Sequence, residues 1–248
     1  MSSTRIVACC FIAVLISGCA HWQRRQTTHF VMHYEKGSPA ERDIDELAVK
    51  IEGFHKDATE TYDFIPDRKI SYYFHNRLPL SFFGSQCWGY IWMDRIHVAY
   101  SEKGKDESPH ELRHYVLHKI NRSAPDFFDE GSAGIGIKIQ DKTFHQWVKE
   151  TAPAKIDLEA CIKNPDRFGK PGDFVAYSFC TFLFSKLGNK KYGQFYRRVT
   201  KKNYSPVLEE LTGMPFGSLE AEWKKLVQAQ HTGRKKSEAN KSMNHDKQ

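Results

Sequence analysis

The sequence predicts an α+β fold, with an N-terminal mixed β-sheet lobe that carries one helix and a C-terminal lobe that is mainly helical. Residues 28–100 contain short stretches in which apolar and polar side chains alternate, which is typical of half-buried strands. From residue 108 onward, apolar residues instead recur every three or four positions between glycine and proline breaks, as in amphipathic helices. With 40% hydrophobic and 13% aromatic residues among 248, the chain can build the core of one domain of about 200 residues.

The first half is expected to form strands around one long helix. Thr28–Tyr34 and Ile70–Phe74 alternate as strands do, and Tyr90–Tyr100 is expected to be a hairpin whose turn lies near Asp94. Between the first two strands, Pro39–Tyr62 has apolar residues three or four positions apart, which predicts a helix. Together these elements predict a small mixed sheet with a helix across it.

The second half is expected to be helical throughout. Gly188, Gly213 and Pro215 interrupt its apolar pattern and therefore mark expected helix ends. In chain order, the expected helices span residues 108–120, 130–140, 174–187, 195–200, 205–211 and 216–229.

One stretch of the second half, Ser108-Pro-His-Glu-Leu-Arg-His114, has the spacing of a metal site. On a helix with about 3.6 residues per turn, His110 and His114 lie one turn apart on the same face, so both imidazoles reach one metal ion beside Glu111. A catalytic zinc ion takes three protein ligands and keeps a fourth position for water. Glu130 lies far enough along the chain for a second helix to fold back and supply the third ligand, so the sequence predicts a Zn²⁺ site here.

The residues around this motif resemble those of the gluzincin zinc metallopeptidases, the thermolysin-like superfamily. In that family His-Glu-x-x-His is completed by a downstream Glu, often in a Glu-Gly-x-Ala context, which here is Glu130-Gly-Ser-Ala133. The resemblance implies that His110, His114 and Glu130 are zinc ligands and that Glu111 is the general base. It also implies a sheet lobe followed by a helical lobe, with the metal helix at the seam between them.

Two departures from family patterns bear on this hypothesis. Many gluzincins carry an acidic residue four positions after the ligand Glu, where it orients a ligand His, but this chain has Gly134 there. The metzincin pattern is excluded, because Leu117 and Ile120 stand where that branch needs Gly and His. The specific resemblance covers about residues 107–134, and a looser similarity in the order of elements covers about residues 28–226.

The same residues also fit simpler interpretations. Ser108, Pro109 and Glu111 suit a capping box, in which Glu111 only caps the N-terminus of a helix. Glu130 also suits the first turn of a helix, where the dipole favours a carboxylate. His118 extends the histidine face by one more turn, and it is expected to be packed or solvated and not a fourth ligand.

Substrate contacts are expected from two further segments. The oxyanion formed in hydrolysis needs a hydrogen-bond donor besides the metal, and the gluzincin resemblance implies a Tyr or His from the helical lobe. Tyr177 is the candidate, and a Tyr that only packs on an apolar helix fits the same position equally well. The strand Ile96–Tyr100, just upstream of the metal helix, is expected to bind an extended substrate at the sheet edge.

The N-terminus, residues 1–18, is expected to be a signal peptide. Arg5 precedes the apolar run Ile6–Ile16, which is too short to span a bilayer as a stable anchor. The end of this segment, Leu15-Ile-Ser-Gly-Cys19, resembles the lipobox of bacterial lipoproteins, which implies that Cys19 is lipidated; an ordinary signal peptide with an incidental Cys is the alternative. Because Ala20 is not the Asp that commonly retains such proteins at the inner membrane, the expected location is the bacterial cell envelope, at the periplasmic face of the outer membrane.

Export leaves three cysteines in an oxidising compartment, and three cannot all pair. Cys180 lies in an apolar run and is expected to be buried, so a disulfide between Cys87 and Cys161 is expected. The formal charge of +7 is spread along the chain and concentrated partly in residues 231–248, a basic tail that is expected to be disordered. This distribution is not a nucleic-acid signal, and residues 19–230 form the expected metallopeptidase-like domain.

The function predicted from these features is zinc-dependent hydrolysis of peptide bonds in a peptide or protein substrate, by a protein held to the membrane through Cys19. One alternative is a non-catalytic lipoprotein that keeps the peptidase fold and acts as a binding or envelope-assembly factor. A second alternative is a zinc hydrolase that acts on cell-wall material. The sequence indicates neither the substrate nor the oligomeric state.

Overall fold

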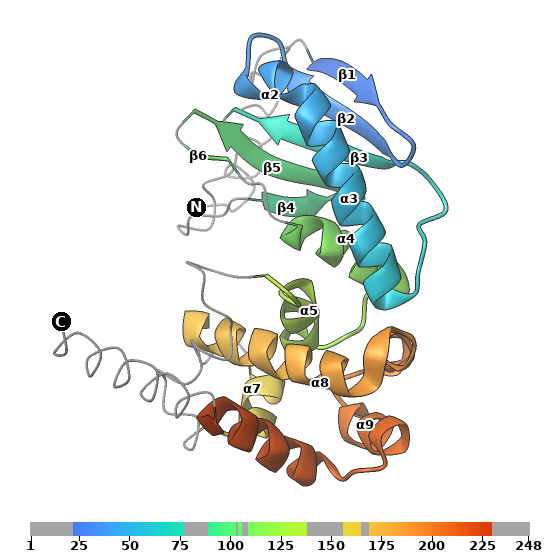
Figure 1. Ribbon diagram of the computed structural model, residues 1–248, viewed down its shortest axis with the longest axis vertical. Coiled ribbons are helices and arrows are strands. Elements are labelled where there is room, and N and C mark those ends of the chain that lie inside the picture. The colour runs from blue at the N-terminus through green and yellow to red at the C-terminus, as the bar shows by residue number, and fades with distance from the viewer. Residues whose placement is uncertain are drawn as a thin grey trace, which may run out of the picture. The chain divides into compact units, whose positions relative to one another are not determined.

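A computed structural model describes residues 22–76, 89–102, 104–105, 109–137, 156–164 and 169–229 of the chain (Figure 1). Two compact units can be distinguished. The first comprises Met1–Gly53 and Arg68–Glu107, and the second comprises Phe54–Asp67 and Ser108–Gln248. The α+β prediction is confirmed, since a mixed sheet lies in the first unit and the second is helical.

The first unit is built on a six-stranded sheet in the order β1-β2-β3-β5-β4, with β6 paired to β5. The central strands β2, β3 and β5 are parallel to one another, whereas β1 and β4 pair antiparallel at the two sides. The strands are β1 (Trp22–Gln26), β2 (Phe30–Glu35), β3 (Ile70–His75), β4 (Gly89–Trp92), β5 (Arg95–Ser101) and β6 (Gly104–Lys105). The sequence did not predict β1, whose polar composition gives no alternating apolar pattern.

Alternation of side chains defines the two faces of this sheet. In β2, β3 and β5 alternate residues form one buried face, and His75 and His97 are buried on the other. The buried face includes Phe30, Met32, Tyr72, Phe74, Ile96 and Val98. The part of helix α3 (Ile44–Tyr62) that belongs to the first unit, up to Gly53, lies across the sheet in Figure 1, and a short helix α2 (Pro39–Arg42) precedes it. The predicted long helix is therefore confirmed, but it is broken at Asp43, which caps the end of α2.

The predicted hairpin near Asp94 is confirmed, and its turn places Met93 and Asp94 at positive φ angles of 48° and 63°. The prediction that Ile96–Tyr100 forms a sheet edge is wrong. This segment belongs to β5, which pairs with β3 on one side and with β4 on the other. Alternation in a sequence specifies the faces of a strand but not its neighbours, so the return of β4 beside β5 was not visible in it.

The second unit is a set of packed helices, none of which in the described part of the chain is long and apolar enough to cross a membrane. Gly188 breaks one long helical segment with φ 69° and ψ 168°, which confirms the predicted helix end. The helix expected over residues 195–200 begins directly after that break instead. The helices are α4 (His110–Ile120), α5 (Asp126–Ala133), α7 (Leu158–Lys163), α8 (Gly169–Arg198) and α9 (Tyr204–Thr212), followed by residues 216–229.

The helix that carries Glu130 is shorter than predicted. It ends at Ala133 instead of continuing to Gln140, because Gly134 caps it and Gly136 turns the chain away with φ 74°. Predictions for residues 1–18, Cys19, Ser108 and the tail 231–248 fall outside the described residues.

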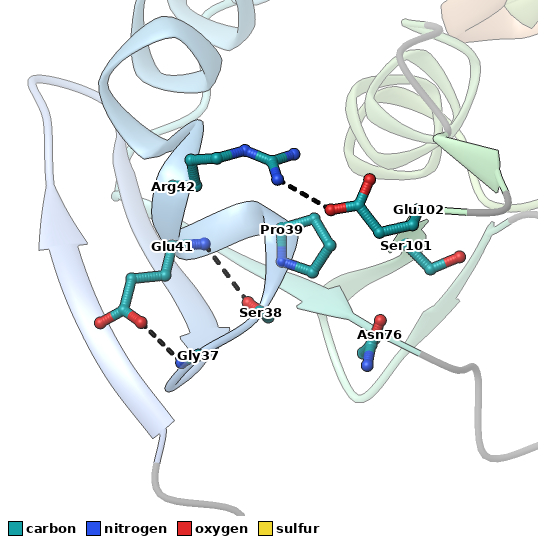
Figure 2. Close-up of a pocket in the computed structure, with 8 residues that line it drawn as sticks. All are labelled: Gly37, Ser38, Pro39, Glu41, Arg42, Asn76, Ser101 and Glu102. Carbon is teal, nitrogen blue, oxygen red and sulfur yellow. Dashed lines mark hydrogen bonds and ion pairs between the residues drawn. The ribbon is translucent and has the colours of Figure 1, made fainter.

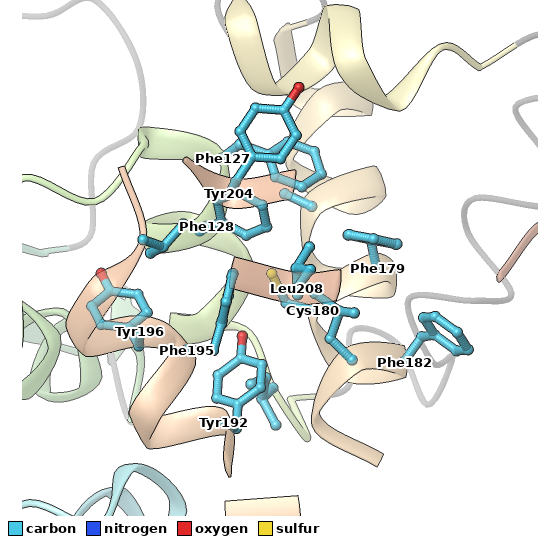
Figure 3. Packing of buried hydrophobic residues seen from close by; sticks show 14 of the residues in the cluster. Phe127, Phe128, Phe179, Cys180, Phe182, Tyr192, Phe195, Tyr196, Tyr204 and Leu208 are labelled. Atoms are coloured by element: carbon cyan, nitrogen blue, oxygen red, sulfur yellow. The ribbon is translucent and has the colours of Figure 1, made fainter. Parts of the chain in front are cut away.

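The core of the second unit consists mainly of aromatic and aliphatic side chains from α5, α8 and α9 (Figure 3). Cys180 is fully buried there, as predicted, and its thiol is free. Cys161 is also a free, buried thiol, so the predicted disulfide with Cys87 is wrong; Cys87 itself lies outside the described residues. Cys161 faces the helical core from α7, where it packs as a small apolar residue. The labelled core residues are Phe127, Phe128, Phe179, Cys180, Phe182, Tyr192, Phe195, Tyr196, Tyr204 and Leu208.

Candidate metal centre

Helix α4 presents its histidines on one face. It begins after Pro109, whose position shows no side-chain capping hydrogen bond within the described residues; Ser108, the predicted cap, is not among them. Because one turn separates His110, His114 and His118, their rings follow one another along the helix, with centroids 4.5 Å and 5.9 Å apart. His114 is buried, and His118 is partly exposed.

Helix α5 brings its carboxylates to this face because its aromatic side chains hold it against the core. Phe127 and Phe128 are almost completely buried, and the next two residues, Asp129 and Glu130, therefore face α4. Arg113 of α4 reinforces the contact. Its buried guanidinium donates to the backbone carbonyls of Ala133, the last residue of α5, and of Ile135 just beyond it.

The three predicted ligands come together in the structure. The Nε2 atoms of His110 and His114 are 3.1 Å apart, and each lies 3.5 Å from Oε2 of Glu130. Their donor atoms form one of the groups with metal-ligating geometry in the described part of the chain. All three residues belong to the second unit.

These separations fit a zinc ion. Zn²⁺ bound tetrahedrally at about 2.0 to 2.1 Å from each donor would hold its ligands about 3.3 Å apart, close to the measured distances. Two imidazoles and one carboxylate also form a donor set that catalytic zinc sites use. Asp129 and Glu130 add two carboxylates to a cluster of imidazoles, so the neutral-imidazole form of the cluster has a negative charge that a divalent cation would balance.

The carboxyl group of Glu130 is ionised in this environment. Burial by itself would raise its pKa, but hydrogen bonds and charges from His110 and His114 outweigh burial and lower the pKa to about 2. Glu130 is therefore available as an anionic ligand at neutral pH.

Asp129, which the sequence analysis did not single out, contacts His114 at the ring nitrogen that faces away from Glu130. Its Oδ2 atom lies 2.9 Å from Nδ1 of His114 and 3.1 Å from Nε2 of His118. The Tyr196 hydroxyl donates to Oδ1 of Asp129 at 2.6 Å. His114, His118 and Asp129 form a second group in the described part of the chain that could hold a metal ion, so the expectation that His118 is not a ligand stays a prediction. The only sequence signal for Asp129 was its position directly before Glu130.

Tyr177 lies beside the candidate metal centre, as its predicted role requires. Its ring centroid is 6.1 Å from that of His110, in an edge-to-face arrangement. Burial raises the pKa of Tyr177, and the charges of Glu130 and Glu111 raise it further, so the hydroxyl keeps its proton and remains a donor. Glu111, the predicted general base, is half-buried in the first turn of α4 and close enough for its charge to act on Tyr177.

A side chain at position 134 would collide with the ring of Tyr177. A Cβ atom built on Gly134 would lie 2.2 Å from Cδ1 of Tyr177, so the tyrosine ring occupies the space that a side chain would need. An acidic residue at this position, which many gluzincins have, cannot fit unless Tyr177 moves.

A hollow in the first unit lies where β3 and β5 end, near Asn76 and Ser101 (Figure 2). Its prominent charged groups are paired with each other, because Arg42 Nη1 donates to Oε1 of Glu102 at 2.8 Å. None of the candidate ligands lines this hollow.

Comparison with known proteins gives one kind of match. No protein-family model matches the chain, and no curated protein matches it. Solved structures of M1 zinc metallopeptidases do match the chain. A two-domain M1 zinc metallopeptidase E323A mutant bound to L-tryptophan is 13% identical to the chain, with a TM-score of 0.44. The two-domain E323A mutant bound to L-arginine is 14% identical, with a TM-score of 0.39. An M1 zinc metallopeptidase E323A mutant from Deinococcus radiodurans is 13% identical, with a TM-score of 0.41.

These matches cover 83 to 84% of this chain, which spans about half the length of each matched chain, 50 to 51%. The structural neighbours are thus zinc metallopeptidases with a loosely similar fold and little sequence identity.

Proposed function

We propose that this chain is a zinc-dependent metallopeptidase that hydrolyses peptide bonds in a peptide or protein substrate. The observation that carries the proposal is the convergence of His110 Nε2, His114 Nε2 and Glu130 Oε2, at separations of 3.1 to 3.5 Å that suit one zinc ion. A capping role for Glu111 or Glu130 does not require these three donor atoms to meet.

In this proposal Glu111 and Tyr177 have separate roles beside the zinc ion. Bound zinc would polarise the scissile carbonyl and make a water molecule acidic enough to lose a proton near neutral pH. Glu111, next to His110 on α4, takes that proton as general base and passes it to the leaving amine. Tyr177 keeps its own proton, because burial and nearby carboxylates raise its pKa, and donates a hydrogen bond to the developing oxyanion.

We further propose that the protein is a lipoprotein of the bacterial cell envelope, anchored through Cys19 at the periplasmic face of the outer membrane. The support is the lipobox-like sequence that ends at this cysteine. Mass spectrometry of the mature N-terminus should find acyl chains on Cys19, and Cys19→Ser should release the protein from membranes without unfolding it. A free Cys19 thiol in the mature protein would refute the anchor and leave the metal site untouched.

The experiment for the catalytic proposal compares zinc content and hydrolysis in four purified proteins. These are the wild type, Glu111→Gln, His114→Ala and Glu159→Gln. The last is a matched control, since Glu159 is an exposed residue of α7 that pairs with Lys163. Zinc is measured by elemental analysis, and hydrolysis is measured with a library of quenched fluorescent peptides.

We expect one zinc per chain in the wild type, in Glu111→Gln and in the control, and little zinc in His114→Ala. Glutamine keeps the size of Glu111 but cannot accept the proton, so hydrolysis should fall by at least about 100-fold. Equal hydrolysis by the wild type and Glu111→Gln would show that Glu111 only caps the helix. Stoichiometric zinc in His114→Ala would place the metal elsewhere.

The non-catalytic alternative makes a different forecast for the same proteins. A binding or envelope-assembly factor would hold zinc without hydrolysing any peptide, and the substitution of Glu111 would then change nothing that the assay measures. A hydrolase of cell-wall material would also spare the peptides, but incubation with purified peptidoglycan would release soluble fragments in a zinc-dependent way.

A further inference from the structure

Asp129 is the meeting point of three side chains from two other helices. Its Oδ2 atom is 2.9 Å from His114 Nδ1 and 3.1 Å from His118 Nε2, and its Oδ1 atom accepts the Tyr196 hydroxyl at 2.6 Å. The Asp129 side chain is only 17% exposed, and Tyr196 is fully buried. A buried carboxylate with this many donors has a fixed orientation.

That orientation decides the chemistry of the His114 ring. An ionised carboxylate only accepts hydrogen bonds, so the nitrogen facing Asp129 must carry a proton. In a neutral ring the other nitrogen, Nε2, then has a free lone pair, and this is the atom that faces His110 and Glu130. Consecutive residues of α5 thus hold the two sides of one imidazole, Asp129 at Nδ1 and Glu130 at Nε2.

We propose that Asp129 is the positioning residue that holds His114 as an Nε2 ligand for zinc, and that the Tyr196 hydroxyl holds the Asp129 carboxylate in place for that role. This inference rests on the zinc site proposed above. It adds the partner that orients the ligand, for which the sequence offered no candidate after Gly134.

The structure also shows why no such carboxylate comes from position 134. The ring of Tyr177 fills the space in which a side chain at position 134 would have to lie, 2.2 Å from the Cβ of any residue there. Asp129 reaches His114 from the preceding turn of α5 instead. Tyr177 itself lies beside His110, where the proposed mechanism needs a hydrogen-bond donor.

Tyr196 and His118 are expected to contribute unequally to holding the Asp129 carboxylate in place. Burial raises the pKa of Tyr196 and the charge of Asp129 raises it further, so its hydroxyl stays a donor at every pH at which the protein would work. His118 is 40% exposed and donates to an oxygen that His114 already occupies. It therefore serves as a matched control for a contact to Asp129 that should not position a ligand.

The test is a zinc competition titration against a chromophoric chelator, with no substrate present. Orienting partners of metal ligands typically contribute 10- to 100-fold in metal affinity, so Asp129→Asn should weaken zinc binding by about 10- to 100-fold. Tyr196→Phe, which removes only the hydroxyl, should weaken it by a smaller factor. His118→Asn should stay within about fivefold of the wild type, because exposed charged contacts contribute little.

A second measurement needs no substitution and covers the case in which Asp129→Asn does not fold. Long-range ¹H–¹⁵N NMR of the zinc-loaded wild type should show His114 with its proton on Nδ1 and the metal on Nε2. Metal on Nδ1 would overturn the proposal, and so would wild-type zinc affinity in a folded Asp129→Asn protein. If the wild type binds no zinc at all, the proposed metallopeptidase function fails with it, which distinguishes the two failures.

Discussion

Acidification is expected to destabilise the first unit through two buried histidines of its sheet. His75 on β3 and His97 on β5 are 8% and 7% exposed, and Nε2 of the first lies 2.9 Å from Nδ1 of the second. Tyr73 and Tyr90 stack on the faces of His97 at centroid distances of 4.8 and 4.9 Å. Burial lowers the pKa of both histidines to about 4, and for His97 the neighbouring His75 and Arg95 lower it further.

The sign of the effect follows from proton binding in the two states. Between pH 6.5 and pH 4 the unfolded chain protonates these histidines while the folded chain does not, so acid favours unfolding. The stabilising contribution of the neutral pair is complete above pH 6.5 and is lost as the pH falls toward 4.

The magnitude can be worked out from the same pKa values. For one ring with a pKa of 6.5 unfolded and about 4 folded, the loss at pH 5.0 is about 2 kcal/mol relative to neutral pH. If the two rings titrated independently, the free energy of unfolding would fall by about 4 kcal/mol. Because some solvent reaches the rings and stabilises their charged forms, we expect a decrease of about 2 to 3 kcal/mol. That is a large share of a typical unfolding free energy of 5 to 15 kcal/mol.

The assay is urea unfolding, followed by circular dichroism, at pH 7.5 and pH 5.0. It compares the wild type with a His75→Gln/His97→Asn variant, in which neutral amides replace the two rings at the positions of the bonded nitrogens. Chelator is present at both pH values, so that the metal content is the same. The candidate metal centre is identical in the two proteins, so its contribution cancels in the comparison.

We expect the wild type to lose about 2 to 3 kcal/mol more than the variant between the two pH values. The variant is expected to be less stable at pH 7.5, which does not affect the comparison of pH dependence. Equal pH dependence in the two proteins would refute the reasoning, since it would mean that the rings are protonated in the folded state without penalty.

Two further predictions concern the core of the second unit. In Gly131→Ala the new Cβ would meet the Ala176 carbonyl oxygen and the Cys180 Sγ at 2.5 Å, so the variant should lose about 1 to 3 kcal/mol in thermal or urea unfolding. Gly53→Ala, in a helix with no atom within 4 Å of the new Cβ, is the control and should unfold no more easily than the wild type. A Gly131→Ala protein as stable as this control would show that α5 and α8 are less closely packed. Burial also raises the pKa of the Cys161 and Cys180 thiols to about 11 and 12, so mass spectrometry should find both unalkylated by iodoacetamide at pH 8 in the folded protein and alkylated in urea. Rapid labelling of either thiol before unfolding would contradict their burial.

The sequence by itself was sufficient for features that depend on spacing along one element. Helical periodicity places His110 and His114 on one face of α4, and the structure has them there with their Nε2 atoms 3.1 Å apart. Alternation of apolar residues likewise identified β2, β3 and the β4–β5 hairpin, and Gly188 ends a helix as its backbone freedom suggests.

Only the tertiary structure decided which elements face one another. The order of strands put β5 inside the sheet, although its sequence is equally compatible with an edge. Cys161 is enclosed in the core of the second unit with a free thiol, whereas counting cysteines had suggested a disulfide.

The same division holds for the residues of the candidate metal centre. Spacing and motif identified Glu130, but the carboxylate that contacts His114 Nδ1 is its neighbour Asp129, which is held by Tyr196 from 67 residues further along the chain. No periodic pattern encodes that contact, because it depends on how closely α5 packs against α4 and α8. The ring of Tyr177 occupies the space that a side chain at residue 134 would need, whereas the carboxylate beside His114 belongs to residue 129, and both facts depend on how α5 packs against its neighbours.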